Sequence, residues 1–134
     1  MDRDDERAHA LFASACAQGN AAGCVNLGSM LLADGDAVTA SVRFQWACDR
    51  GEERGCAELA TLHAQGGGGI PLDLPRAATL YEIACHAGDG TACFRAASLR
   101  DSGSVAKNPL LVITLYEQAC ATGIADACER LPKR

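Results

Sequence analysis

The sequence predicts an all-α fold: an α/α solenoid (superhelix) of four helix-turn-helix repeats, with one disulfide in each hairpin. Three observations support this fold class. The eight cysteines form four pairs with the same spacing within each pair. A glycine lies between the two cysteines of each pair, and a similar apolar pattern precedes each pair. The pairs recur roughly every 35 residues, a period typical of arrays of helical hairpins. No segment alternates apolar and polar residues over a useful length, so we expect no sheet.

Two cysteines eight positions apart define each predicted hairpin, and every cysteine belongs to one such pair: Cys16/Cys24, Cys48/Cys56, Cys85/Cys93 and Cys120/Cys128. Three residues after the first cysteine of each pair comes a glycine: Gly19, Gly51, Gly88 and Gly123. Within one continuous helix, residues eight apart are separated by roughly 12 Å, which is too far for a disulfide. A glycine in the left-handed conformation ends a helix, and a chain reversal there brings the two sulfurs together.

Two other states of the cysteines stay open at this point. Zinc sites usually draw on Cys-x-x-Cys pairs or on closely spaced cysteine and histidine. The chain has no Cys-x-x-Cys, and its histidines occupy unrelated repeat positions: His9, His63 and His86. Reduced thiols buried as small apolar groups would instead indicate a reducing compartment. Four disulfides within the hairpins are the state that we expect.

The first helix of each repeat is predicted from the apolar residues that precede the first cysteine. An aromatic residue lies four positions before it: Phe12, Phe44, Tyr81 and Tyr116. Alanine lies one position before it: Ala15, Ala47, Ala84 and Ala119. Leucine lies five positions before it in three repeats, and arginine in the other: Leu11, Leu80, Leu115 and Arg43. These offsets place the side chains on one helix face that packs against neighbouring helices.

The second helix of each repeat begins near the second cysteine. Small residues four positions after it allow close helix packing: Gly28, Ala60 and Ala97. Pro132 takes that position in the last repeat, so we expect a last helix of about one or two turns. The repeats are expected at roughly 4–35, 36–72, 73–108 and 109–134, in one domain covering 1–134. The four successive glycines that begin at Gly66 are interpreted as a flexible linker.

Several segments resemble Sel-1-like repeats, specifically the disulfide-bonded repeats of the Helicobacter cysteine-rich protein family. They are Leu-Tyr-Glu-Ile-Ala-Cys at 80–85, Leu-Tyr-Glu-Gln-Ala-Cys at 115–120, Gly-Ser-Val-Ala-Lys-Asn at 103–108 and Ala-Gly-Cys-Val-Asn-Leu-Gly at 22–28. The resemblance covers essentially the whole chain. It implies a solenoid related in shape to tetratricopeptide arrays, with protein or peptide binding on the curved surface, often in secreted or periplasmic proteins. Arg43 and Trp46 depart from the family pattern.

Charge and composition exclude several classes of partner. Twelve basic and 17 acidic residues give a net charge of −5, whereas nucleic acids and anionic membranes attract concentrated positive charge. The longest nearly apolar run, 109–116, is far too short to span a bilayer, so no membrane insertion is expected. We expect a monomeric, non-catalytic scaffold with no cofactor or metal, which binds a protein or peptide partner on its concave face.

The resemblance also raises an enzymatic alternative, because some members of that family have been described as binding or slowly hydrolysing β-lactams. Ser104 and Lys107 fit the Ser-x-x-Lys motif of penicillin-recognising enzymes. However, the chain lacks the accompanying Ser-Asp-Asn and Lys-Thr-Gly motifs, and the match falls in a connector between hairpins. We therefore assign no catalytic residue. A haem or metal carrier is a minor alternative, with no axial-ligand pattern to support it.

The candidate binding patch is predicted on the first helices. Arg43 and Trp46 are three positions apart, so the guanidinium is expected to stack on the indole. Tryptophan and arginine are enriched at interface hot spots. Ile83 takes the position of Trp46 in the next repeat, and Glu82 and Glu117 complete the hypothetical patch. The alternative role of Trp46 is to fill the space left by the missing leucine.

The expected compartment follows from the cysteines. Paired cysteines at this density indicate the periplasm, the cell exterior or the mitochondrial intermembrane space. The acidic, polar segment 1–7 lacks the apolar region of a signal peptide. A periplasmic or secreted protein would therefore have a leader that is absent from this chain, whereas reduced thiols would indicate the cytoplasm.

Overall fold

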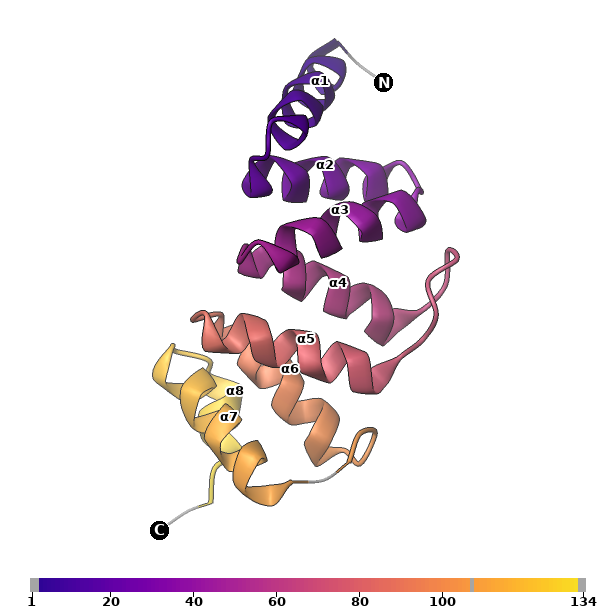
Figure 1. Ribbon diagram of the computed structural model, residues 1–134. Coiled ribbons are helices and arrows are strands. Elements are labelled where there is room, and N and C mark those ends of the chain that lie inside the picture. The colour runs from indigo at the N-terminus through magenta and orange to yellow at the C-terminus, as the bar shows by residue number, and fades with distance from the viewer. Residues whose placement is uncertain (1–2, 107, 133–134) are drawn as a thin grey trace.

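The computed structural model describes residues 3–106 and 108–132, and these residues form eight helices stacked in chain order (Figure 1). The helices are α1 (Arg3–Ala17), α2 (Ala21–Ala33), α3 (Ala37–Asp49), α4 (Glu53–Gln65), α5 (Leu74–His86), α6 (Gly90–Asp101), α7 (Pro109–Ala121) and α8 (Ala125–Glu129). The described residues contain no strand, only an isolated bridge between Gly67 and Ile70. The predicted all-α solenoid is confirmed, and α8 is the expected short helix.

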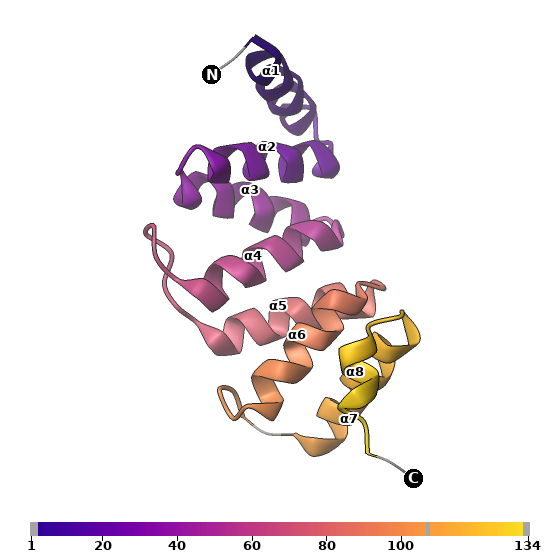
Figure 2. The ribbon, with the colours of Figure 1, turned by 180° about the vertical axis from the view of Figure 1, so that it is seen from behind.

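Each helix packs mainly against the helices that precede and follow it in sequence. The helices α1, α3, α5 and α7 begin the four hairpins, and we call them the first helices. The helices α2, α4, α6 and α8 complete the hairpins, and we call them the second helices. Figure 1 shows α7 in front of α8, and the view from behind in Figure 2 shows α8 in front of α7. The solenoid therefore has a first-helix face and a second-helix face.

The turn inside each hairpin is a Schellman motif, in which a glycine takes positive φ at the C′ position. The amide after the glycine donates to the carbonyl of the alanine that precedes the first cysteine, as Glu52 does to Ala47 at 3.0 Å. The glycine amide donates to the cysteine carbonyl, as Gly51 does to Cys48 at 3.0 Å. All four hairpins share these two bonds. The first cysteine is thereby fixed in the last turn of the first helix.

Four disulfides link the ends of the helices at these turns: Cys16–Cys24, Cys48–Cys56, Cys85–Cys93 and Cys120–Cys128. Their Cα–Cα distances of 4.5 to 4.7 Å lie at the short end of the usual range, as expected where two helix ends meet at a tight turn. No cysteine among the described residues is free. The predicted pairing is confirmed.

The core is built from the repeated aromatic and alanine positions. Phe44 is fully buried, and Tyr81 and Tyr116 are nearly so. A Cβ at Gly28 would lie 2.6 Å from the Phe44 ring, so α2 and α3 require glycine at this crossing. One predicted core residue differs, because Leu11 on α1 is 68% exposed. No described helix precedes α1, and the side of α1 that carries Leu11 lies open.

Asparagine or aspartate caps the N-termini of α3, α5 and α7. Asp36 accepts from the amide of Thr39 at 3.1 Å, and Asp73 and Asn108 cap α5 and α7 in the same way. The loop before α5 contains the four glycines, all with positive φ. The loop, predicted as a flexible linker, forms a turn with defined contacts: Ile70 is bridged to Gly67 and is buried, and His63 Nδ1 lies 3.1 Å from the carbonyl oxygen of Pro71.

Candidate functional site

The large apolar side chains that remain exposed are distributed unequally between the two faces. Six such residues occur in the described part of the chain: Leu11 on α1, Val38 and Val42 on α3, Leu72 in the loop before α5, Ile83 on α5 and Leu110 on α7. None lies on a described second helix. Because the second helices bury their large apolar residues more completely, the first-helix face is the more apolar surface and the candidate binding site.

Two grooves of about 510 Å³ each lie beside α3 on this face. One separates α3 from α5 and is lined by Pro75, Thr79 and Ile83 of α5. The other lies against α4 and the glycine loop, and Val38, Val42 and Trp46 of α3 line it. Gln45 and Asp49 border both grooves, so the two form one surface across the second and third repeats.

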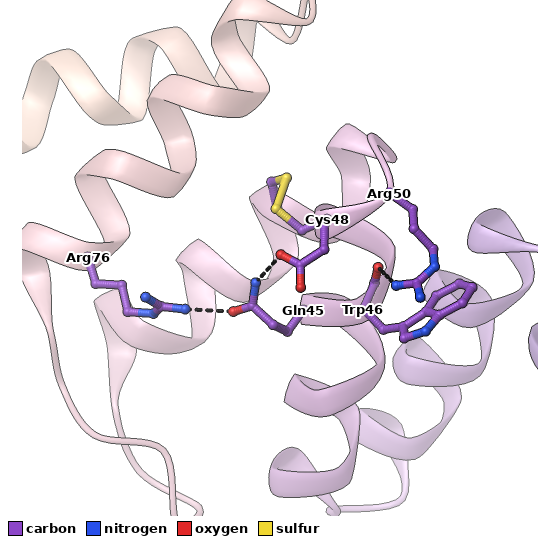
Figure 3. The surroundings of a disulfide bond; sticks show 7 residues. Gln45, Trp46, Cys48, Arg50 and Arg76 are labelled. Carbon is purple, nitrogen blue, oxygen red and sulfur yellow. Dashed lines mark hydrogen bonds between the residues drawn. A yellow bond between two sulfur atoms is a disulfide. The ribbon is translucent and has the colours of Figure 1, made fainter. Parts of the chain in front are cut away.

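A chain of three polar side chains crosses the boundary between these repeats. Arg76 of α5 donates to Gln45 Oε1 at 2.6 Å, and Gln45 Nε2 donates to an Asp49 carboxylate oxygen at 2.8 Å. Figure 3 shows this chain beside the Cys48–Cys56 disulfide, with Arg76 reaching α3 from the neighbouring repeat. Both ends of the Gln45 amide are therefore occupied, which fixes the rim of the groove.

Trp46 lies on the other side of α3 and carries a stacked arginine (Figure 3). The guanidinium carbon of Arg50 lies 3.5 Å from the centre of the Trp46 ring, and Arg50 also donates to the Trp46 carbonyl at 3.2 Å. The predicted partner was wrong: Arg43 is exposed, and the structure gives it no ring contact or ion pair among the described residues. Arg50 is one full turn after Trp46, and that spacing also favours contact.

The remaining residues of the predicted patch have different surroundings. Ile83 is 48% exposed and lines the groove between α3 and α5. Glu117 is exposed on α7, outside both grooves. Glu82 forms an ion pair with Arg100 of α6, in which both side chains are mostly buried. Trp46 and Ile83 thus line adjoining grooves, whereas Glu82 is paired with a residue of its own repeat.

Sequence reasoning missed Gln45, Arg76, Val38 and Val42. The two valines had a usable signal, because they are apolar residues on the side of α3 opposite Phe44 and Ala47. The bond between Gln45 and Arg76 had none, since these residues are 31 positions apart and do not occupy equivalent repeat positions.

One carboxyl group and one phenol group have shifted pKa values. The hydrogen bond from the Thr39 amide lowers the pKa of the Asp36 carboxyl, which caps α3. Burial raises the pKa of the Tyr116 phenol, whose hydroxyl donates to Asp101 at 3.1 Å. Neither group lies in the two grooves, so their effect is on stability.

The residues considered for catalysis or metal binding are not gathered into a site. Ser104 lies exposed in the connector after α6 and shares a 2.9 Å hydrogen bond with Ser102, whereas Lys107 lies outside the described residues. Within 3–106 and 108–132, no group of three His, Cys, Asp or Glu side chains is placed to hold a metal ion. No helix in the same ranges has the length and hydropathy needed to cross a membrane.

The fold, the hairpin turns and the disulfides define a helical-repeat protein, and the Sel1 repeat model matches residues 1–20, 54–89 and 90–123. The chain belongs to the Sel1 repeat family. Proteins of this family are generally protein-interaction scaffolds and typically non-catalytic. The unmatched segment 21–53 contains α3 and therefore Trp46, where the sequence departs from the repeat pattern.

Three solved structures are similar to the chain. A protective antigen of uropathogenic Escherichia coli with an SLR fold has a TM-score of 0.80 and 25% identity over 89% of the chain. The chain spans 26% of that protein. A Sel1 repeat protein from Oxalobacter formigenes has a TM-score of 0.77 and 28% identity, covering 90% of this chain and 93% of that one.

Cysteine-rich protein B of Helicobacter pylori is similar over nearly the full length of both chains, with a TM-score of 0.72, 26% identity and 96% of each chain covered. The resemblance noted from the sequence is confirmed. No curated protein sequence gives a significant match to the chain. Four disulfides are typical of proteins in oxidising compartments.

Proposed function

We propose that this chain is a non-catalytic scaffold that binds a protein or peptide partner on its first-helix face, which we take to be the concave face. The observation that carries the proposal is the unequal distribution of exposed apolar side chains, which lie on first helices or in the loop before α5. Burying such side chains against a partner is favourable, by about 25 cal/mol for each Å² removed from water.

The shape of this face favours an elongated partner segment. The two grooves meet along α3 and continue onto α5, so a peptide that crosses both would contact two repeats. Repeat proteins commonly bind extended segments on such continuous surfaces. Val42 and Ile83 are half exposed and would meet apolar side chains of the partner.

Trp46 and Ile83 are the anchors of the proposed patch, with Arg50 stacked on the indole in the role first given to Arg43. The stacked guanidinium holds the indole in one orientation and reduces the entropy that binding must remove. Arg43 and Glu117 are exposed but line neither groove. Glu82 supports it indirectly, because its pairing with Arg100 ties α5 to α6.

The compartment that fits the four disulfides is the periplasm or the cell exterior. Partners of this scaffold would then be exported proteins or peptides from them. We propose no cofactor for this function.

The experiment is to select peptides from a displayed library against the oxidised chain and to measure their affinity for variants. Trp46→Ala should weaken a selected peptide by about 2 kcal/mol or more, the loss typical of an interface hot spot. Glu58→Ala, an exposed substitution on α4, is the control and should leave affinity unchanged. Trp46 is the single tryptophan, so its fluorescence reports binding directly.

Two outcomes would contradict the proposal. Binding of the selected peptides to Trp46→Ala and to Ile83→Ser as tightly as to the original chain would place the binding surface elsewhere. Alternatively, Trp46→Ala could lower the melting temperature by many degrees. In that case the indole is a packing residue, and Ile83→Ser becomes the deciding variant.

A further inference from the structure

A third groove lies on the opposite face, between the second helices α4 and α6. Its volume is about 620 Å³, and it is lined by Ala64 at the end of α4, by Tyr81 of α5, and by Phe94, Arg95, Ser98 and Leu99 of α6. Its lining is therefore mostly apolar, with small hydroxyl groups along one wall. Its two ends are marked by Thr91 of α6 and by Ser102, the C-cap residue of that helix.

Both aromatic rings that line this groove are held by contacts outside it. The Tyr81 hydroxyl lies 2.7 Å from the hydroxyl of Thr61 on α4, so the ring is fixed between the two repeats. Phe94 packs against Tyr116 of α7, with ring centres 5.9 Å apart and planes tilted by 57°. These contacts keep an apolar floor in place without a ligand.

Arg95 is the single charged residue that lines the groove. Its guanidinium lies 6.0 Å from the centre of the Tyr81 ring, above the apolar floor. None of the ion pairs in the described residues involves Arg95, and no carboxylate lines the groove. A positive charge with no carboxylate beside it leaves this groove electrostatically open to an anionic group.

We infer that this groove binds a partner segment in which an acidic side chain is next to an aromatic or large aliphatic one. The carboxylate pairs with Arg95 through charge-assisted hydrogen bonds, and the apolar side chain covers Phe94 and Leu99. From Thr91 to Ser102 the groove follows α6 for roughly 16 Å, at 1.5 Å per helical residue. About five extended residues fit this length, with Arg95 between the two ends, so the acid lies within the segment and not at its C-terminus.

This site is separate from the first-helix face and shares none of its lining residues. The two binding proposals can therefore fail independently. If both are correct, the scaffold joins two partner segments, one on each face of the solenoid. Trp46 lies outside this groove, so its fluorescence should not respond to the second ligand.

The test uses the oxidised ¹⁵N-labelled chain and an acetylated, amidated peptide, Gly-Ser-Asp-Phe-Asp-Ser-Gly. We expect the peptide to shift the amide resonances of Thr91, Ser98 and Leu99, with a dissociation constant of about 1 mM or tighter. Arg95→Gln should weaken binding about tenfold, because it removes a charge-assisted hydrogen bond but keeps the side-chain length. Arg54→Gln, at an exposed arginine of α4 outside the groove, should leave the affinity unchanged.

Further peptides test the acidic and the aromatic side chains separately. The peptide with asparagine in place of both aspartates, and the peptide with alanine in place of phenylalanine, should each bind about tenfold more weakly. Unchanged binding to Arg95→Gln, equal binding of the neutral peptide, shifts confined to α3 and α5, or no shifts at all would each overturn the inference. Tighter binding of Gly-Ser-Gly-Phe with a free C-terminus would overturn the assignment to an internal acid.

Discussion

The helices α3 and α5 occupy the same place in successive repeats, and they share three equivalent buried positions. Both bury two equivalent alanines completely and one aromatic residue: Ala40, Ala47 and Phe44 in α3, and Ala77, Ala84 and Tyr81 in α5. The helix α5 also buries Ala78 and Leu80. Each ends in the same glycine turn and carries a disulfide to the next helix. These residues and the turn are what the two first helices have in common.

The positions five and two before the first cysteine differ between the two helices in both chemistry and burial. Leu80 of α5 is 5% exposed, whereas Arg43, at the equivalent position of α3, is exposed. Trp46 and Ile83 are the second differing pair, and both line grooves. The repeat thus varies outside the shared alanines, aromatic residue and turn, and the positions among these that are exposed are the ones available for binding.

Exchanging the residues at the first differing position should give the largest effect. Leu80→Arg should reduce the free energy of unfolding by at least about 2 kcal/mol, because a buried leucine side chain is lost and a charge enters its apolar surroundings. Urea denaturation followed by circular dichroism measures this change. The reciprocal Arg43→Leu should change stability by less than about 0.5 kcal/mol, as for most exposed positions. A large gain from Arg43→Leu would show that α3 lacks a leucine that its packing needs.

Substituting the residue before the second cysteine of a pair should have an intermediate effect on stability. It is Gly55 in the second repeat and Ala92 in the third. A Cβ at Gly55 would lie 2.8 Å from the carbonyl oxygen of Phe44, so Gly55→Ala should force the helices apart and cost about 1–2 kcal/mol. Ala92→Gly should cost about 1 kcal/mol through lost helix propensity. Thermal unfolding compares the stabilities of the two variants. A higher melting temperature of Gly55→Ala would mean that the two helices of the second hairpin are as far apart as those of the third.

Replacing the N-terminal cap of α3 should have the smallest effect, which should appear as a change in how stability depends on pH. The Asp36 carboxyl has a pKa below its ordinary value of 3.8 in the folded chain. Its contribution to stability is therefore present above that ordinary pKa and is lost as the pH falls through the lowered one. Between about pH 5 and about pH 2, Asp36→Asn should lose less stability than the original chain.

Asp34→Asn, at an exposed aspartate in the same connector, is the matched control for this cap. It should show the same decline in melting temperature with falling pH as the unchanged chain. An equal decline in all three proteins would mean that the Asp36 carboxylate does not stabilise α3.

The fold and the disulfides could be predicted because both depend on residues close together in sequence. A glycine three positions after a cysteine determines the turn, and the turn brings the two sulfurs together. The candidate site was predicted in part: Trp46 and Ile83 line grooves, but the stacking arginine is Arg50. The bond between Arg76 and Gln45 depends on how far one repeat is rotated against the next, and no local pattern encodes that rotation.

Every disulfide in this chain closes within a single hairpin, between cysteines eight positions apart. Eight cysteines allow roughly a hundred pairings, yet the native one joins each cysteine of a hairpin to its near neighbour across the turn. Short loops are the fastest and least costly to close, so oxidation favours the native pairs from the start. In the proposed oxidising compartment, each hairpin would be oxidised independently of the others. Efficient maturation of this protein would then require an oxidant but little disulfide isomerase activity.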